Sequence, residues 1–163
     1  MCVTDHTPGY GSAAKYVAST LLEIGHDTSI YPIKSVTIVE IMGRDAGWLT
    51  GASVLARNKY NFAPHLIYLP EVPFVEEEFI EDVKAAMEKY NNVVIAVSEG
   101  IKDANGKYVS ATTAVKIHLV TASLVVQASV WNILLSRIYR LRCVLLKLTF
   151  FKEAPLICHL LLI

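Results

Sequence analysis

Hydrophobic and polar positions alternate in helical and strand-like patterns up to about Thr113, as in a soluble α/β domain. A first helix is predicted to start at residues 9–12, because apolar residues then recur at helical spacing. A second helix is expected from Gly47 towards Asn58. A third is expected from near Val75, because its first turn is acidic and its later turns are basic. The apolar positions of the first helix are Ala13, Ala14, Val17, Leu21 and Leu22.

Three short runs between these helices are predicted to be strands. Residues 36–41 form a β-branched run, and residues 66–69 and 93–97 are continuously apolar. Strands that are apolar on both faces and separated by helices are typical of a parallel sheet covered on both sides. The expected fold class is therefore α/β, with a partial doubly wound parallel sheet in one domain over residues 1–113.

The pattern changes in residues 114–163, which form an apolar tail. Residues 117–135 contain no Asp, Glu, Lys or Arg, and no glycine follows Gly106. One interpretation is a membrane span of residues 117–135 with flanking arginines, although the Thr, Ser, Gln and Asn content of this segment weakens it. The other interpretation is a tail that was not selected to pack on this domain. The flanking arginines are Arg137, Arg140 and Arg142.

Composition restricts the possible partners and the compartment. The 163 residues carry fifteen basic and fifteen acidic side chains, so no net field attracts nucleic acid or an anionic membrane. The three cysteines have no paired or metal-site spacing, and the N-terminus has no signal-peptide pattern. A reduced, cytoplasmic protein is expected.

Polar clusters follow all three predicted strands. Met42-Gly43-Arg44 follows the first strand, Pro70-Glu71 the second and Ser98-Glu99-Gly100 the third. In open parallel sheets, ligands bind beyond the carboxyl ends of the strands. Arginine suits phosphate and carboxylates accept hydrogen bonds from hydroxyls, so this edge predicts a site for a phosphorylated polyol. The competing interpretation, that polar residues simply follow strands in solvated loops, explains each cluster alone better than all three together.

These motifs resemble those of the 6-phosphofructokinases. The stretch 4–15, Met42-Gly43-Arg44 with residues 45–48, residues 69–71 and residues 97–100 occur in that family's order and spacing, over roughly the first two thirds of the chain. The resemblance is strongest to the group that includes pyrophosphate-dependent members. It implies the phosphofructokinase fold and a cytoplasmic, homo-oligomeric glycolytic enzyme. The implied reaction transfers a phosphoryl group from ATP or pyrophosphate, with Mg²⁺ on the donor, to the 1-hydroxyl of fructose 6-phosphate.

The resemblance also implies roles for individual residues. Met42, Gly43 and Arg44 would contact the sugar phosphate, and Glu71 would accept hydrogen bonds from sugar hydroxyls. Ser35 stands where many relatives have an arginine that reaches a neighbouring subunit's site.

The family's donor loop and its catalytic base precede the stretch 4–15, and residues 1–3 stand in their place. Asp5 and His6 are interpreted as loop residues, so no catalytic, cofactor-binding or metal-ligating residue is assigned. The expectation is a fragment truncated at its N-terminus and inactive alone. The alternative is a non-enzymatic sugar-phosphate-binding remnant, for which residues 117–135 could serve as a membrane tether.

A shift of the reading frame would explain the apolar tail at residues 114–163. Family members tend to continue with a segment like Ala-Phe-Gly-His-Ser-Gln-Leu-Gly-Gly-Ala-Gly, and codons for it shifted by one base encode residues 118–128 of this chain. Residues 143–163 can be encoded so that the alternative frame gives a later family-like segment. Residues 114–163 are therefore interpreted as out-of-frame translation and are not expected to pack natively.

Several side chains receive plain interpretations. Lys15, His26 and His65 are expected to be surface groups. Gly47 and Trp48 are expected to pack a helix against the sheet. Residues 105–106, Asn-Gly, predict a turn, with a hairpin as one possibility.

Overall fold

The computed structural model describes residues 9–109, 142–149 and 157–162, the last two ranges as backbone pairing only. Its helices are α1 (Tyr10–Ser29), α2 (Trp48–Ala52), the 3₁₀ helix η1 (Ser53–Ala56) and α3 (Glu76–Lys89). Its strands are β1 (Ser35–Ile41), β2 (Leu66–Tyr68), β3 (Asn92–Ser98), β4 (Arg142–Thr149) and β5 (Ile157–Leu162).

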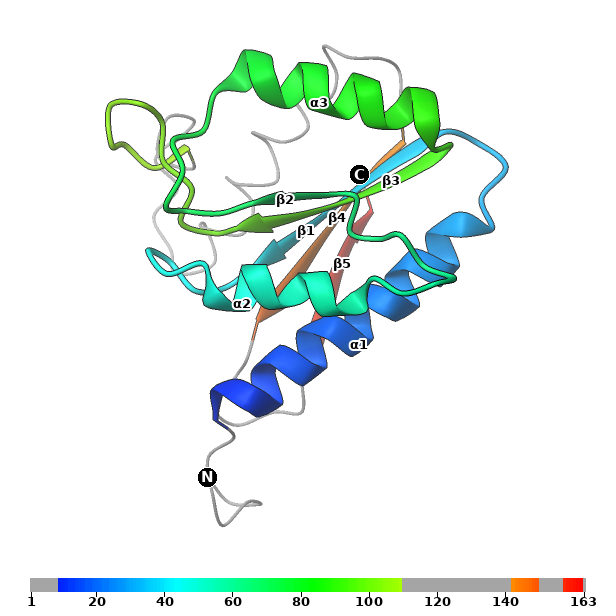
Figure 1. Cartoon of the computed structure of the whole chain (residues 1–163), viewed down its shortest axis with the longest axis horizontal. Helices are drawn as coiled ribbons and strands as arrows, with labels where there is room; N and C mark the ends of the chain where they lie inside the picture. The colour runs from blue at the N-terminus through cyan, green and yellow to red at the C-terminus, as the bar shows by residue number, and fades with distance from the viewer. Residues whose placement is uncertain (1–8, 110–141, 150–156, 163) are drawn as a thin grey trace.

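The strands form one sheet in the order β2-β3-β1-β4-β5. The first four strands run parallel, and β5 pairs antiparallel with β4. Helix α3 covers one face of the sheet, and α1 and α2 cover the other (Figure 1). The fold is therefore α/β with a parallel sheet covered on both faces, which confirms the predicted class.

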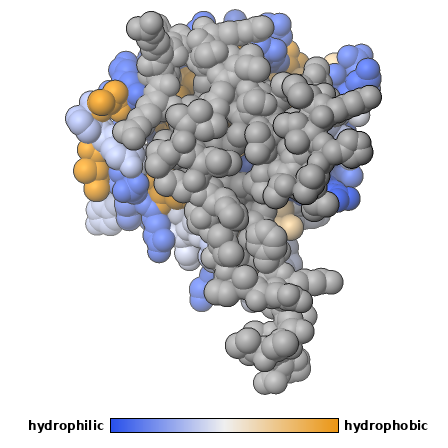
Figure 2. Space-filling model, turned by 180° about the vertical axis from the view of Figure 1, so that it is seen from behind, coloured by the Kyte–Doolittle hydropathy of each residue, from blue (hydrophilic) through white to orange (hydrophobic). Residues whose placement is uncertain are grey.

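Alternate residues of the central strands supply the two cores. Val36 and Ile38 of β1 pack towards Phe79 of α3, in a cluster that continues along β3. Val39 and Ile41 of β1 pack instead towards α1. Every residue of β1 is buried, as expected for a strand with helices over both faces. Seen from behind, the coloured residues around the rim are mostly hydrophilic, with small hydrophobic areas between them (Figure 2).

The predicted helices and turn are confirmed, with one difference of detail. Helix α1 buries Val17 and Leu21 at helical spacing, and α3 has its three glutamates in the first turn. The second helix is shorter than predicted, because it tightens into η1 and the backbone becomes extended at Arg57. The hairpin also forms, with Lys102 and Tyr108 bridged across its two arms.

Two segments of the tail join the sheet. Strand β4 pairs with β1 from Ser35 opposite Arg142 to Ile41 opposite Leu148. Strand β1 has a row of backbone groups on its second side, and the apolar segment β4 satisfies them. Only the backbone of these two tail segments is described, so the expectation that residues 114–163 do not pack natively stays a prediction. The boundary at residue 113 and the out-of-frame origin stay predictions.

The proposed span at residues 117–135 lies outside the described residues. Within the parts of the chain that the structure describes, no helix is long and apolar enough to cross a membrane.

His65 is not the surface group that was expected. It is half-buried at the entry to β2, where its Nδ1 accepts a hydrogen bond from the backbone N–H of Val94 at 3.0 Å. Its ring lies 4.4 Å from the ring of Tyr90, measured between centroids. Burial lowers the pKa of His65 below its usual value of 6.5. The expectations for Lys15 and His26 are confirmed, because both are exposed.

Truncation of Phe79 tests the core beneath α3. Phe79 is fully buried, so Phe79→Ala should lower the free energy of unfolding by about 3–5 kcal/mol through lost contacts and a cavity. Urea denaturation of the whole chain measures this change. Phe62→Ala is the matched control, because Phe62 is 59% exposed and its truncation should cost much less. Equal losses in the two variants would contradict the assignment of the core.

The environment of His65 predicts a pH-dependent stability. Protonation would place a hydrogen on Nδ1 and break the bond from Val94, so the folded state favours the neutral ring. The lowered pKa means that this contribution is present above the unfolded value near pH 6.5 and is lost as the pH falls through the folded value. The free energy of unfolding should therefore fall between pH 7.5 and pH 5.5, because the unfolded state takes up the proton that the folded His65 resists.

Denaturation at both pH values would measure that slope. His65→Asn keeps an acceptor oxygen but removes the titrating ring, so the slope should decrease. His26→Asn, at an exposed position, serves as the control and should keep it. An unchanged slope in His65→Asn would show that His65 does not cause the pH dependence.

Candidate functional site

The chain leaves β1 through a tight turn at Met42-Gly43-Arg44. Gly43 has φ 149° and Arg44 has φ 43°, both in the left-handed region. A Cβ at Gly43 would lie 2.7 Å from the carbonyl oxygen of Ala46, so the turn requires glycine there. The N–H of Ala46 donates to the carbonyl of Gly43 at 2.9 Å and closes the turn.

Glu99, directly after β3, holds this turn in place. The backbone N–H groups of Gly43 and Arg44 both donate to Oε1 of Glu99, at 3.3 and 3.2 Å. Glu99 N–H in turn donates to the carbonyl of Ile41 at 3.0 Å. Gly100 lies so close to the backbone of Arg44 that a Cβ would overlap its carbonyl oxygen. The ends of β1 and β3 are therefore fitted directly against each other.

Glu71, after β2, reaches the same region. Its Oε1 accepts from the N–H of Gly47 at 2.7 Å. Gly47 is buried against Pro70 and Glu71, which confirms its expected role in close packing. Trp48 is 75% exposed, so its expected packing against the sheet is wrong. The helix turns this side chain outwards, while Tyr10 donates through its hydroxyl to the Trp48 carbonyl at 3.1 Å.

A second cluster lies beside the turn, and sequence reasoning missed it. Lys102 Nζ is 2.5 Å from Oδ1 of Asp45, and the Tyr108 hydroxyl donates to Oδ1 and Oδ2 of Asp45 at 3.0 and 3.3 Å. The hydrogen bond from Lys102, followed by that from Tyr108, lowers the pKa of Asp45, and the same bond raises the pKa of Lys102. The Asn-Gly turn predicted the hairpin, but no sequence signal linked it to Asp45.

Arg44 combines a fixed backbone with an available side chain. Arg44 is exposed, and its guanidinium takes part in none of the hydrogen bonds between described residues. Its carbonyl oxygen accepts from the Ser98 hydroxyl at 3.4 Å. Met42 beside it is half-buried. This edge of the sheet therefore carries a guanidinium, which suits a phosphate, and the carboxylates of Glu71 and Glu99, which accept from the backbone of residues 43–47.

The predicted edge residues therefore come together, whereas Ser35 lies elsewhere. Ser35 is the first residue of β1, at the opposite end of that strand from Arg44. It is buried, and its hydroxyl donates to Oδ1 of Asn92 at 2.8 Å. In this chain Ser35 thus serves to join the starts of β1 and β3.

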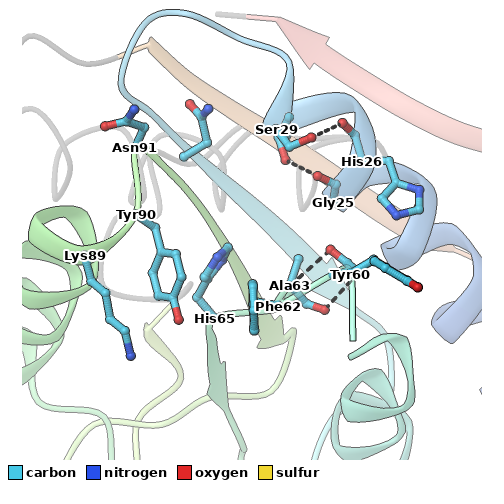
Figure 3. A pocket seen from close by; sticks show the side chains of 13 residues that line it. Gly25, His26, Ser29, Tyr60, Phe62, Ala63, His65, Lys89, Tyr90 and Asn91 are labelled. Carbon is cyan, nitrogen blue, oxygen red and sulfur yellow. Dashed lines mark hydrogen bonds between the residues drawn. The ribbon is translucent and has the colours of Figure 1, made fainter. Parts of the chain in front are cut away.

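A cavity of about 290 Å³ lies at the opposite edge of the sheet from Arg44, beside the start of β3. The rings of Phe62, His65 and Tyr90 and the side chain of Lys89 line it (Figure 3). Across the described part of the chain, no group of three His, Cys, Asp or Glu side chains is arranged to hold a metal ion.

Comparisons with known proteins identify the family of the chain. The phosphofructokinase family model matches residues 1–133. The chain is 44% identical over 107 residues to a pyrophosphate–fructose 6-phosphate 1-phosphotransferase of Rhodospirillum rubrum, covering 66% of this chain and 26% of that protein. It is 33% identical over 113 residues to an ATP-dependent 6-phosphofructokinase of Erwinia tasmaniensis, covering 68% of this chain and 33% of the relative.

A solved structure extends the similarity to the fold. The pyrophosphate-dependent phosphofructokinase from Marinobacter aquaeolei superposes with a TM-score of 0.55 at 27% sequence identity, covering 97% of this chain and 46% of that chain. The chain thus spans between about a quarter and a third of the length of these curated relatives. Because the family model matches most of its residues, the chain belongs to the phosphofructokinase family.

Proposed function

We propose that the edge formed by Met42, Gly43, Arg44 and Glu71 binds fructose 6-phosphate. The observation that carries the proposal is the exposed Arg44 on a turn whose backbone Glu99 fixes. Relatives of both donor types are named for fructose 6-phosphate chemistry or as 6-phosphofructokinases, which supports this substrate.

Each residue has a distinct role in this proposal. The Arg44 guanidinium donates to the 6-phosphate, since its planar fork matches phosphate oxygens. Gly43 lets the backbone approach the ligand, and the half-buried Met42 supports the turn. Glu71 accepts from a sugar hydroxyl through lone pairs that the Gly47 N–H does not use.

The reaction that this edge would serve is phosphoryl transfer to the 1-hydroxyl of fructose 6-phosphate. The donor would be ATP or pyrophosphate carrying Mg²⁺, which neutralises charge on the transferred group. Binding of the acceptor at Arg44 fixes the sugar relative to the donor, and such positioning is a large part of catalysis in phosphoryl transfer. The contribution proposed for the described residues of this chain is acceptor binding.

Calorimetric titration of the whole chain with fructose 6-phosphate tests the proposal. Arg44→Gln should weaken binding by about 10-fold to 100-fold, because one charge-assisted interaction with phosphate is worth about 1.5–3 kcal/mol. Lys84→Gln removes the same charge from an exposed position on α3 and should leave the affinity unchanged. The affinity for fructose, which has no phosphate, should be the same in Arg44→Gln and in the unchanged chain.

Two results would contradict the proposal. One is the absence of fructose 6-phosphate binding by the unchanged chain, and the other is an equal loss in Arg44→Gln and Lys84→Gln. A turnover assay with ATP or pyrophosphate then tests the expectation that the chain alone is inactive. Binding without turnover favours an inactive fragment or a sugar-phosphate-binding remnant, whereas turnover identifies a complete phosphotransferase.

A further inference from the structure

Asp45 carries a negative charge and directly follows Arg44, the residue proposed to bind the phosphate group. The charge of Arg44 is among the causes that lower the pKa of the Asp45 carboxyl. A carboxylate and a guanidinium form strong paired hydrogen bonds when they meet. An unengaged Asp45 would therefore compete with a phosphate group for Arg44.

The structure engages Asp45 from the other side. Lys102 makes an ion pair with Oδ1, and the Tyr108 hydroxyl bridges both carboxylate oxygens. Lys102 Nζ also lies 5.0 Å from the centroid of the Tyr108 ring. The Asp45 carboxylate thus has three contacts to the hairpin, and its negative charge is matched by Lys102.

The hairpin that carries these two side chains is itself firmly attached. Ile101 is fully buried in the core beneath α3, and the Val109 N–H donates to its carbonyl at 3.1 Å. The Phe74 N–H donates to the Lys102 carbonyl at 2.7 Å. At the tip, Asp103 Oδ1 accepts from the N–H groups of Asn105 and Lys107, each at 2.9 Å. Lys102 and Tyr108 are therefore presented to Asp45 from a fixed support.

We propose that Lys102 and Tyr108 are positioning residues that hold the Asp45 carboxylate away from Arg44, so that the guanidinium is left for the phosphate of the substrate. This inference rests on the proposed function, because it takes Arg44 as the phosphate ligand. Its consequence is a specific charge balance. Lys102 balances the charge of Asp45, so Asp45 does not neutralise the positive charge that Arg44 offers to an anionic ligand.

Titration of three variants with fructose 6-phosphate tests the proposal. Lys102→Gln frees the Asp45 carboxylate and should weaken binding by up to about fivefold, the upper end of the range for an exposed ion pair. Adding Asp45→Asn to Lys102→Gln removes the competitor and should restore the affinity to within about twofold of the unchanged chain. Lys107→Gln makes the same change of charge at the exposed hairpin tip and should have no effect.

The signs of these effects separate the proposal from its competitors. A merely structural ion pair would leave the double variant as weak as Lys102→Gln or weaker. A general field effect would make Lys107→Gln as weak as Lys102→Gln. Either result overturns the proposal. Only recovery of binding in the double variant supports the proposal. A second substitution that merely damaged the structure further would not restore affinity.

A measurement without ligand keeps this proposal distinct from the proposed function. The Nε–H resonance of Arg44 can be followed by NMR in the unliganded chain and in the same variants. Protection of this proton from exchange should rise in Lys102→Gln and fall again when Asp45→Asn is added. If no protection develops in Lys102→Gln, the proposal is wrong even if the chain binds fructose 6-phosphate. If protection develops but the chain binds no sugar phosphate, only the proposed substrate fails.

Discussion

Complete burial of β1 is the constraint on which the rest of the structure depends. The strand has helices over both faces and parallel neighbours on both sides, so its side chains and backbone groups are all committed to the interior. The chain can meet solvent only where the strand stops. Polar chemistry is therefore concentrated at Met42-Gly43-Arg44, and the neighbouring strand ends must accommodate this turn. The contacts from Glu99 and the close approach of Gly100 are consequences of that geometry.

Much of this arrangement was predictable because local patterns and global packing agree. The apolar runs identified β1, β2 and β3, and the rule for parallel sheets placed Arg44, Glu71 and Glu99 at one edge. Glycine at positions 43 and 47 gave a usable signal for close approach of the backbone. Sequence therefore predicted the residues of the edge better than their individual contacts.

The features that escaped prediction depend on partners distant in sequence. Asp45 pairs with side chains more than fifty positions away, and no periodic pattern encodes that pairing. Histidine is usually a surface residue, but the ring of His65 accepts a hydrogen bond from Val94 of β3, which lies later in the sequence. Strand β4 was missed for another reason: the tail lacks turn residues and periodicity, yet any apolar extended segment can pair with the open side of β1.

The backbone conformation of Arg44 is unfavourable for stability. With φ at 43°, this residue occupies a conformation that is unfavourable for any side chain with a Cβ, by about 1–2 kcal/mol, and that glycine adopts freely. Selection for stability alone would therefore favour glycine at position 44, which would lack the guanidinium. The proposed phosphate-binding role of the guanidinium gives a reason for an arginine in this conformation. On that proposal, part of the cost of the site is carried by the backbone of Arg44 itself, before any ligand binds.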